Sequence, residues 1–402
     1  MKNIKSLIIY GVIILLCIAA FGGYFYSKYS APAASTGISE NSSATASSTT
    51  AAASSESAVS SVSTASASDT AAPSEISENS AYQAKLIKDG NNITGKSEAE
   101  KQAHIKKIMT REIEKLDPNP VVGIGRGEDF GKVTSEAVKN AGGLKEIIKP
   151  GDVVLIKPNL CVQDENFGSP MTTDYRVVQE VINIAYECQA SRVIIAEGNF
   201  ASNAFENKEN KYVELKGAEL FNLNDCEEKD CYELKPQKSL VGKGLFIPKI
   251  YMDADVVIDV AKLKTHFITG VTLGLKNSIG IPSYKIYGIG GDKSGLHMLG
   301  IEEVILDLNK IRKPDFTIID GIIGGENFGP YANTPVNSNI VLAGKDIVAV
   351  DTVSLTFMGF KLENISHIKR AGEEKLGISD LSKIKINGGD LNSMAMQFKP
   401  AF

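Results

Sequence analysis

The pattern of apolar and polar residues divides the chain into three zones, of which the first is a single apolar run. Residues 7–26 are almost all apolar, and a run of about 20 such residues can cross a bilayer as a helix. Lys2 and Lys5 precede it, and no Lys or Arg occurs between Lys28 and Lys85. By the positive-inside rule, we expect residues 1–29 to be a single-pass, signal-anchor-like membrane segment, with the C-terminal domain extracytoplasmic. The alternative is a cleaved signal peptide and a secreted protein, because Ala-Pro-Ala-Ala follows at 31–34.

The second zone, residues 30–84, is dominated by Ser, Ala and Thr, and its first 50 residues or so contain no aromatic side chain. Such a composition buries too little apolar surface to offset the entropy of ordering the chain. The sequence therefore predicts a disordered linker between the membrane segment and the rest of the protein.

A helical lead-in is expected over residues 85–118. Ser97 and Glu100 have the spacing of a capping box, which marks the start of a helix. Apolar residues then recur at helical spacing until Pro118: Ile105, Ile108, Met109, Ile113 and Leu116. This apolar face predicts packing against the domain that follows.

Residues 119–402 form the third zone and alternate short β-branched runs with helical patterns. The expected strands are 121–124, 153–156, 193–196, 256–260, 316–319 and 340–342, and the clearest helices are 177–186 and 301–311. This alternation is typical of an α/β fold with a mostly parallel sheet. Its length fits one large unit or two lobes with a crevice between them.

Overall charge excludes one class of partner. The chain carries 43 Lys and Arg against 48 Asp and Glu. A nucleic-acid binder needs a basic surface, so we expect no nucleic-acid partner.

The predicted strands end in chemically unusual residues. Lys157 follows one strand, Glu197 the next, Lys264 and His266 a third, and Asp320 a fourth. In open α/β sheets, ligands bind at the carboxyl ends of the strands. Each residue alone is explained by an ordinary polar loop, but their joint placement predicts a site at this edge.

The segment from His266 to His297 is the densest source of chemistry in the chain. Lys276 lies ten residues after His266 and is followed by Asn277. An imidazole can exchange a proton near neutral pH. A lysine that is desolvated beside other cations becomes nucleophilic, whereas an exposed one simply binds an anion.

A glycine-rich loop at 288–295 lies inside this segment. Gly290 and Gly291 offer backbone amides able to surround a phosphate or carboxylate, and Lys285 and Lys293 add positive charge. The loop lacks the Gly-Lys-Ser/Thr order of a Walker loop. We therefore expect it to help bind an anion or an anionic cofactor.

A divalent cation is a further hypothesis. The carboxylates of Asp320, Glu326, Asp346 and Asp351 would supply the oxygen ligands that such an ion prefers. The alternative for Asp346 and Asp351 is that they cap or orient a helix, since Asp346 directly precedes an apolar run.

Cysteines are sparse, and their spacing suggests only one local pairing. Cys226 and Cys231 could close a small disulfide loop outside the cell. Cys161 and Cys188 make other pairings equally open.

Several of these motifs together resemble the domain of unknown function 362 family of bacteria and archaea. The resemblance covers residues 121–390 and rests on 151–160, 172–174, 264–266, 275–280, 320–321, 329–330, 346 and 349–351. Some relatives carry ferredoxin-like iron–sulfur segments, whose mark is closely spaced cysteines. This sequence lacks that spacing, so no iron–sulfur cluster is expected.

A more distant resemblance is to lactate racemases of the nickel-pincer type. Those enzymes have a His, a Lys ten positions later that holds the nickel-pincer nucleotide covalently, and a later His that binds nickel. The resemblance implies that His266 is a general acid/base, Lys276 the cofactor anchor and His297 a metal ligand. Where those enzymes have a second catalytic His, this chain has Glu197.

Three functions remain open on the sequence. The first is an envelope-anchored, isomerase- or racemase-like enzyme that transfers a proton or hydride on a small anion, assisted by a metal or cofactor. Here His266, Glu197 and Lys264 are catalytic, His297 binds metal, and the cofactor is bound by Lys276, Asn277, Gly290, Gly291, Lys293 and Lys157. The second is a non-catalytic module that captures an anion or metal. The third is an electron-transfer partner protein.

Overall fold

The computed structural model describes residues 83–111, 116–160, 167–200, 203–289, 292–330 and 332–401. The expected membrane segment and nearly all of the expected linker lie outside these residues, as do Cys161, Gly290 and Gly291. None of the described helices is long and apolar enough to cross a membrane.

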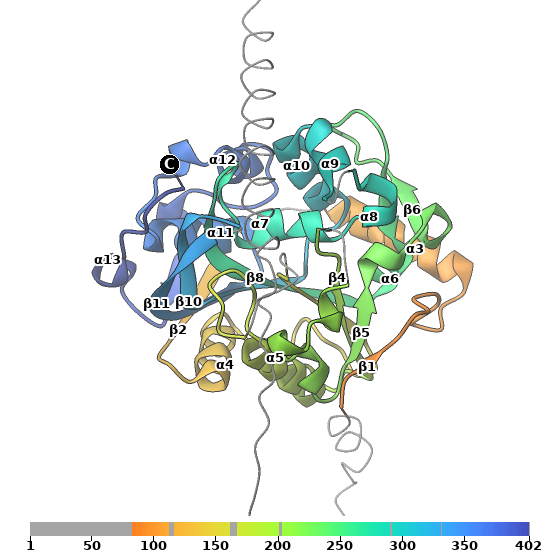
Figure 1. Ribbon diagram of the computed structural model, residues 1–402, viewed down its shortest axis with the longest axis horizontal. Helices are drawn as coiled ribbons and strands as arrows, with labels where there is room; N and C mark the ends of the chain where they lie inside the picture. Colours follow the sequence, from red (N-terminus) through yellow and green to blue (C-terminus); the bar gives the residue numbers. More distant parts are fainter. Residues whose placement is uncertain are drawn as a thin grey trace, which may run out of the picture. The chain divides into compact units, whose positions relative to one another are not determined.

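One ten-stranded sheet runs through the domain (Figure 1). The strand order is β1 (Lys85–Leu86), β5 (Glu219–Asn222), β4 (Arg192–Glu197), β3 (Val153–Pro158), β8 (Val256–His266), β10 (Phe316–Phe328), β11 (Ala332–Gly344), β2 (Val121–Arg126) and β12 (Lys385–Asn387), with β9 (Gly270–Val271) beside β8. Only β11 and β9 run antiparallel to their neighbours. The expected α/β fold with a mostly parallel sheet is confirmed, and the single sheet favours one unit over two lobes.

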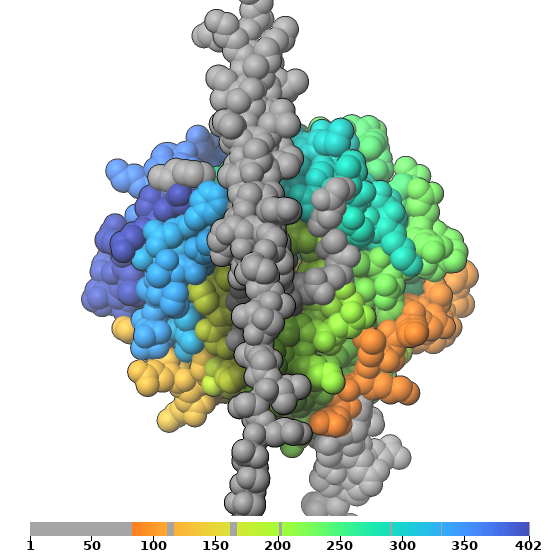
Figure 2. Space-filling model, in the orientation of Figure 1, coloured from red at the N-terminus to blue at the C-terminus, as the bar shows by residue number. Residues whose placement is uncertain are grey.

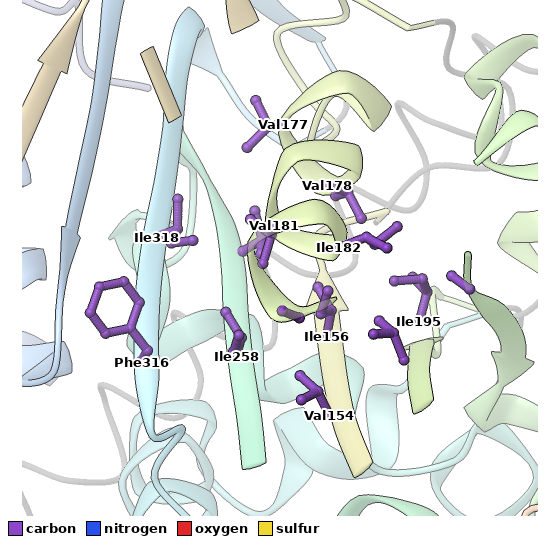
Figure 3. Packing of buried hydrophobic residues seen from close by; sticks show 14 of the residues in the cluster. Val154, Ile156, Val177, Val178, Val181, Ile182, Ile195, Ile258, Phe316 and Ile318 are labelled. Atoms are coloured by element: carbon purple, nitrogen blue, oxygen red, sulfur yellow. The ribbon is translucent and has the colours of Figure 1, made fainter. Parts of the chain in front are cut away.

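Helices cover both faces of the sheet. Along β3, Val154 and Ile156 face one side and Val153 and Leu155 the other, because side chains alternate along a strand. The first side packs against α4 (Phe130–Asn140) and α5 (Tyr175–Glu187), and Figure 3 shows the α5 residues over β3, β8 and β10. The second carries α3 (Glu98–Arg111), α6 (Lys249–Asp253), α7 (Leu273–Asn277), α10 (Ile301–Ile311), α11 (Ile347–Phe357) and α12 (Ser366–Glu373).

Shorter elements complete the domain. They are α8 (Tyr284–Tyr287), α9 (Ser294–Met298), α13 (Leu391–Met394) and a separate hairpin of β6 (Cys231–Leu234) and β7 (Leu245–Pro248). Helices α8 to α10 (cyan) and β11 (light blue) both reach the face shown in Figure 2.

A helix forms in the expected lead-in, where α3 begins after Ser97, but residues 85–86 form strand β1 and Ile113 lies outside the described residues. The Ser97 N–H donates to the Glu100 carboxylate at 2.8 Å, and the Glu100 N–H lies 3.4 Å from the Ser97 hydroxyl oxygen. This pair is the expected capping box at the start of α3. Ile105 and Ile108 are buried against the sheet, so the helix packs on the domain and extends its core.

The local disulfide is not formed. Cys226 and Cys231 are buried free thiols, and burial raises the pKa of both, that of Cys231 to about 12. Each thiol packs in the apolar cluster beside β6 and β7. The expectation of a disulfide between them is wrong for this structure, because the two residues act as small core side chains.

Candidate functional site

A hollow at the carboxyl ends of β3, β4 and β8 collects most of the candidate residues, and we call it the strand-end pocket. Its empty space measures about 540 Å³, a figure that includes open solvent. Its described lining is Asn159, Glu197, Gly198, Asn199, Phe200, Lys264, His266, Thr272, Lys276, Asn277, Ile279, Gly280, Lys293, His297 and Pro330. Seven residues proposed from the sequence therefore meet in one cavity.

Lys157 lies behind the pocket wall and holds Glu197 in place. Its Nζ donates to Glu197 Oε2 at 3.0 Å and to Asn277 Oδ1 at 3.1 Å, with both charged side chains almost fully buried. Glu197 Oε1 accepts from the Gly198 N–H at 2.8 Å. A Cβ on Gly280 would lie 2.2 Å from Oε1. Both carboxylate oxygens are thus occupied, and the pair forms a fixed part of the wall.

Asn277 connects this pair to the neighbouring strands. Its Oδ1 accepts from Asn159 Nδ2 at 2.8 Å, and its Nδ2 donates to Asp259 Oδ1 at 2.6 Å. Lys264 Nζ donates to Asn159 Oδ1 at 3.0 Å. Burial raises the pKa of Asp259 well above its ordinary value. A network of buried hydrogen bonds therefore fixes the position of Asn277 and Lys264 at the pocket.

His266 is the last residue of β8 and presents one face of its ring to a stack of aromatic rings. Phe267 stacks on it with ring centroids 5.3 Å apart, and Phe328 stacks on Phe267 at 5.3 Å. Nδ1 accepts from the Ile268 N–H at 3.1 Å, so Nε2 is the nitrogen that can bond a ligand. Burial, and next the charge of Lys276, hold the pKa of His266 well below its usual range, so the ring is neutral at pH 7.

Helix α7 carries Lys276 and Asn277 and is held at both ends. The carboxylate of Asp351 accepts from the Gly274 N–H at 2.7 Å and from the Leu275 N–H at 2.8 Å. Asn309 Nδ2 donates to the Leu275 carbonyl at 3.0 Å. Leu273 begins the helix with φ +53°, a conformation that side chains rarely adopt and that the surrounding contacts must enforce.

Two more histidines lie within electrostatic reach of Lys276. Burial first, and then the Lys276 charge, lower the pKa of His297 to about 4 and that of His367 to about 3. His297 lines the pocket. His367 is fully buried, and among the described residues neither of its ring nitrogens has a hydrogen-bond partner. Both rings are neutral at pH 7.

Lys293 comes from the glycine-rich loop and closes the pocket against β4. Its Nζ donates to the carbonyls of Gly198 at 2.6 Å and Gly280 at 3.3 Å. Burial lowers its pKa to about 7, so its charge changes in the neutral range. Lys285 instead donates to the Asp225 carbonyl at 3.0 Å and adds no charge at the pocket.

The divalent-cation hypothesis for the four carboxylates is wrong. Asp320 forms a fully buried ion pair with Lys262 at 2.8 Å. Asp346 accepts hydrogen bonds from two N–H groups of α11, and Asp351 accepts from the Gly274 N–H of α7. Glu326 accepts from the Lys399 N–H in the C-terminal segment. Each carboxylate already has its own donors. In the part of the chain that is described, no group of three or more His, Cys, Asp or Glu side chains could hold a metal ion.

Sequence reasoning missed Asp259 and His367 as neighbours of the site. It allowed that Asp351 orients a helix but did not identify that helix as α7. Asp351 reaches α7 across 77 residues of sequence, and no local pattern predicts a contact of that range.

The chain is similar to known proteins, two of which are described here. The thylakoid-associated protein sll1697 of Synechocystis is 29% identical over 238 residues, which are 59% of this chain and 72% of that protein. The lactate racemase apoprotein of Thermoanaerobacterium thermosaccharolyticum matches with 14% identity and a TM-score of 0.35. That match covers 57% of this chain and only 54% of the racemase, so the chain spans about half of that structure.

A family model matches residues 154–356, from β3 to the end of α11, and thus includes every described residue that lines the pocket. On this match the chain belongs to the family described as Domain of unknown function (DUF362).

Proposed function

We propose that the strand-end pocket binds a small anion and that the protein transfers a proton to or from it, as isomerases and racemases do. The observation that carries the proposal is the composition of the pocket. Its described lining contains three lysines and two histidines against a single carboxylate, Glu197, and that carboxylate is bound by Lys157. Such a lining attracts negative charge.

His266 is the proton carrier in this proposal. Its Nδ1 is occupied by the Ile268 N–H, so Nε2 is the nitrogen that contacts a bound group. The ring is neutral in the ligand-free pocket because of burial and the nearby lysines. A bound anion raises the pKa of the ring, which brings its proton exchange toward neutral pH. Lys264 and Lys276 hold the anion against it.

No step in this proposal passes through a metal or a nucleotide. The described residues do not form a metal cage, so His297 would be a lone protein ligand. Among the cofactor residues expected from the sequence, Lys276, Asn277 and Lys293 line the pocket. Lys157 lies behind its wall and, with Asn277, holds Glu197 and the wall in place, so the two lysines Lys276 and Lys293 are the ones available to the anion.

The test is hydrogen–deuterium exchange of small carboxylates in D₂O, followed by proton NMR, with the protein purified from its native host. We expect exchange at C2 of one 2-hydroxy acid or at C3 of one 2-keto acid, and its loss in His266→Gln with affinity for that acid retained. His104→Gln is the matched control, because His104 lies on α3 and is not part of the described lining. Binding without exchange would instead establish a capture module. If the acids show neither binding nor exchange, the proposal is refuted.

We also propose that residues 7–26 anchor this domain outside the cytoplasm. The support is the apolar run and the lysines before it. Protease treatment of intact cells should remove the domain while leaving cytoplasmic markers whole. A protected domain, or one that fractionates without membranes, would contradict the anchor.

A further inference from the structure

We propose that the anion bound in the strand-end pocket carries a second acidic group, which Lys293 binds, so that the substrates are dicarboxylates. This inference rests on the proposed function and names its substrate class. It is based on the separation of the cationic residues within the pocket, because a single carboxylate is too small to reach all of them.

The pocket extends across the ends of three adjacent strands. The sheet order places β3 between β4 and β8, and neighbouring strands are about 4.7–4.9 Å apart, so the ends of β4 and β8 are separated by about 9–10 Å. Gly198 directly follows β4, and His266 is the last residue of β8. Both residues line the pocket. A ligand that fills it therefore has one end beside β4 and the other beside β8.

Lys293 is the cation at the β4 end. Its side chain is almost fully buried, and in the described part of the chain its Nζ donates to backbone carbonyls only, those of Gly198 at 2.6 Å, Gly280 at 3.3 Å and Ile279 at 3.4 Å. The nearby Glu197 already forms its own ion pair. A buried ammonium ion that contacts only neutral oxygens is unfavourable, and the pKa of Lys293 is accordingly lowered to about 7. A carboxylate of the ligand would supply the missing countercharge.

The other two lysines of the pocket belong to the β8 end. The lysine charges that act on His266 are those of Lys276 and Lys264, and Lys264 is itself part of β8. The charge that acts most on Lys293 is instead that of Glu197, the last residue of β4. One carboxylate held by Lys264 and Lys276 against His266 therefore leaves Lys293 for a second one.

The charge at the β4 end favours a carboxylate over a phosphate as the second group. Arginine binds phosphate through two parallel hydrogen bonds, and the described lining of the pocket contains no arginine. Lys293 brings a single positive charge, which balances the single negative charge of a carboxylate. We therefore infer a dicarboxylate rather than a phosphorylated acid.

The experiment is calorimetric titration of the full chain at pH 7 with two matched pairs of acids, butanoate with butanedioate and pentanoate with pentanedioate. We expect the dicarboxylate of at least one pair to bind the wild type about ten- to a hundredfold more tightly than its partner, as one more charge-assisted hydrogen bond implies.

Lys293→Met should bring the affinity for that dicarboxylate close to that for the monocarboxylate. The monocarboxylate affinity itself should change by less than about threefold, because a distant charge is screened by salt. Lys285→Met is the matched control and should behave as wild type, since Lys285 donates to the Asp225 carbonyl and is not part of the described lining.

The outcomes separate this inference from the proposed function. If none of the four acids binds, the anion site fails and the proposed function with it. If the acids of each pair bind the wild type equally, or if Lys293→Met keeps the full advantage of the dicarboxylate, the anion site stands and the second carboxylate at Lys293 is refuted. The last arm is 3-phosphonopropanoate: binding tighter than that of butanedioate would assign the second group to a phosphoryl group and refute the dicarboxylate.

Discussion

Asp351 supports the pocket from a position outside it, and its replacement by Asn gives a sharp test of the electrostatics. The side chain is fully buried and accepts two N–H groups at the start of α7, at 2.7 and 2.8 Å. Those hydrogen bonds favour the ionised carboxylate, whereas burial opposes it. Burial prevails and raises the pKa of Asp351 to about 7 from an ordinary value of 3.8.

A carboxyl group with a raised pKa keeps its proton longer in the folded chain than in the unfolded one. Its contribution to stability is therefore complete below about pH 4 and is lost as the pH rises through about 7. The full loss is about 4 kcal/mol, of which about 3 kcal/mol falls between pH 5 and pH 8. Asn cannot ionise, so the stability of Asp351→Asn should not fall between pH 5 and pH 8 as that of the wild type does. Its Nδ2 cannot accept one of the two N–H groups, so the variant should be less stable than the wild type at pH 5 and gain about 3 kcal/mol relative to it by pH 8.

Urea unfolding at pH 5, 6, 7 and 8, monitored by circular dichroism, measures this difference. The control is Asp380→Asn, since Asp380 is exposed and its pKa is lowered by Ser382 and Lys383. Stability curves of wild type and Asp351→Asn that run parallel across this range would refute the reasoning. A variant destabilised most at pH 8 would show that the two amide hydrogen bonds outweigh burial.

Three further predictions concern neighbouring parts of the structure. The pKa of Lys293 is about 7, so the side chain gains its positive charge between pH 8 and pH 6 and anion affinity should rise over this range. Lys293→Met should remove that rise in a series of titrations at different pH. A rise that is unchanged in the variant would count against a charge at this position. Lys262→Met should destabilise the protein by about 3–5 kcal/mol in urea, because Asp320 is left buried without its partner, and an effect under 1 kcal/mol would contradict this. In Gly280→Ala, the added Cβ would lie 2.2 Å from Glu197 Oε1 and should displace the Lys157–Glu197 pair. Anion binding should weaken at least tenfold while the chain stays folded. Unchanged affinity would show that the pocket wall adapts to the added methyl group.

The sequence predicts the sheet better than it predicts the ends of the strands. All six expected strands form, because β-branched runs bounded by turns are a strong local signal. β8 nevertheless continues to His266, through Lys262 and Lys264, which the pattern placed in a loop. These buried lysines can remain in the strand because the Lys262 Nζ donates a hydrogen bond to Asp320 and the Lys264 Nζ donates one to Asn159. The short strands β1, β5 and β12 lack long apolar runs and could not be found.

The candidate site shows the same division. Parallel strands end at one edge, so the residues at those ends could be grouped from the sequence alone, and three of them, Glu197, Lys264 and His266, line the pocket. The state of each group could not be predicted. His266 is neutral because of burial, and Glu197 is occupied by Lys157 and an amide. Both facts depend on contacts between distant segments.

The hairpin of β10 and β11 has two parts with different roles. Its long paired part belongs to the central sheet, and Pro330 in its connecting turn lines the pocket. Both strands are 13 residues long, and their paired ends extend past the register shift after Gly321 to bring Pro330 to the pocket. Gly329 lies against β8, where a Cβ would be 2.1 Å from the Thr265 carbonyl oxygen. Changes of length or sequence beyond this contact would reshape the entrance without touching α7 or its lysine. Exchanging the hairpin tip should therefore alter the pocket near Pro330 and leave the part lined by Lys264 and Lys276 intact.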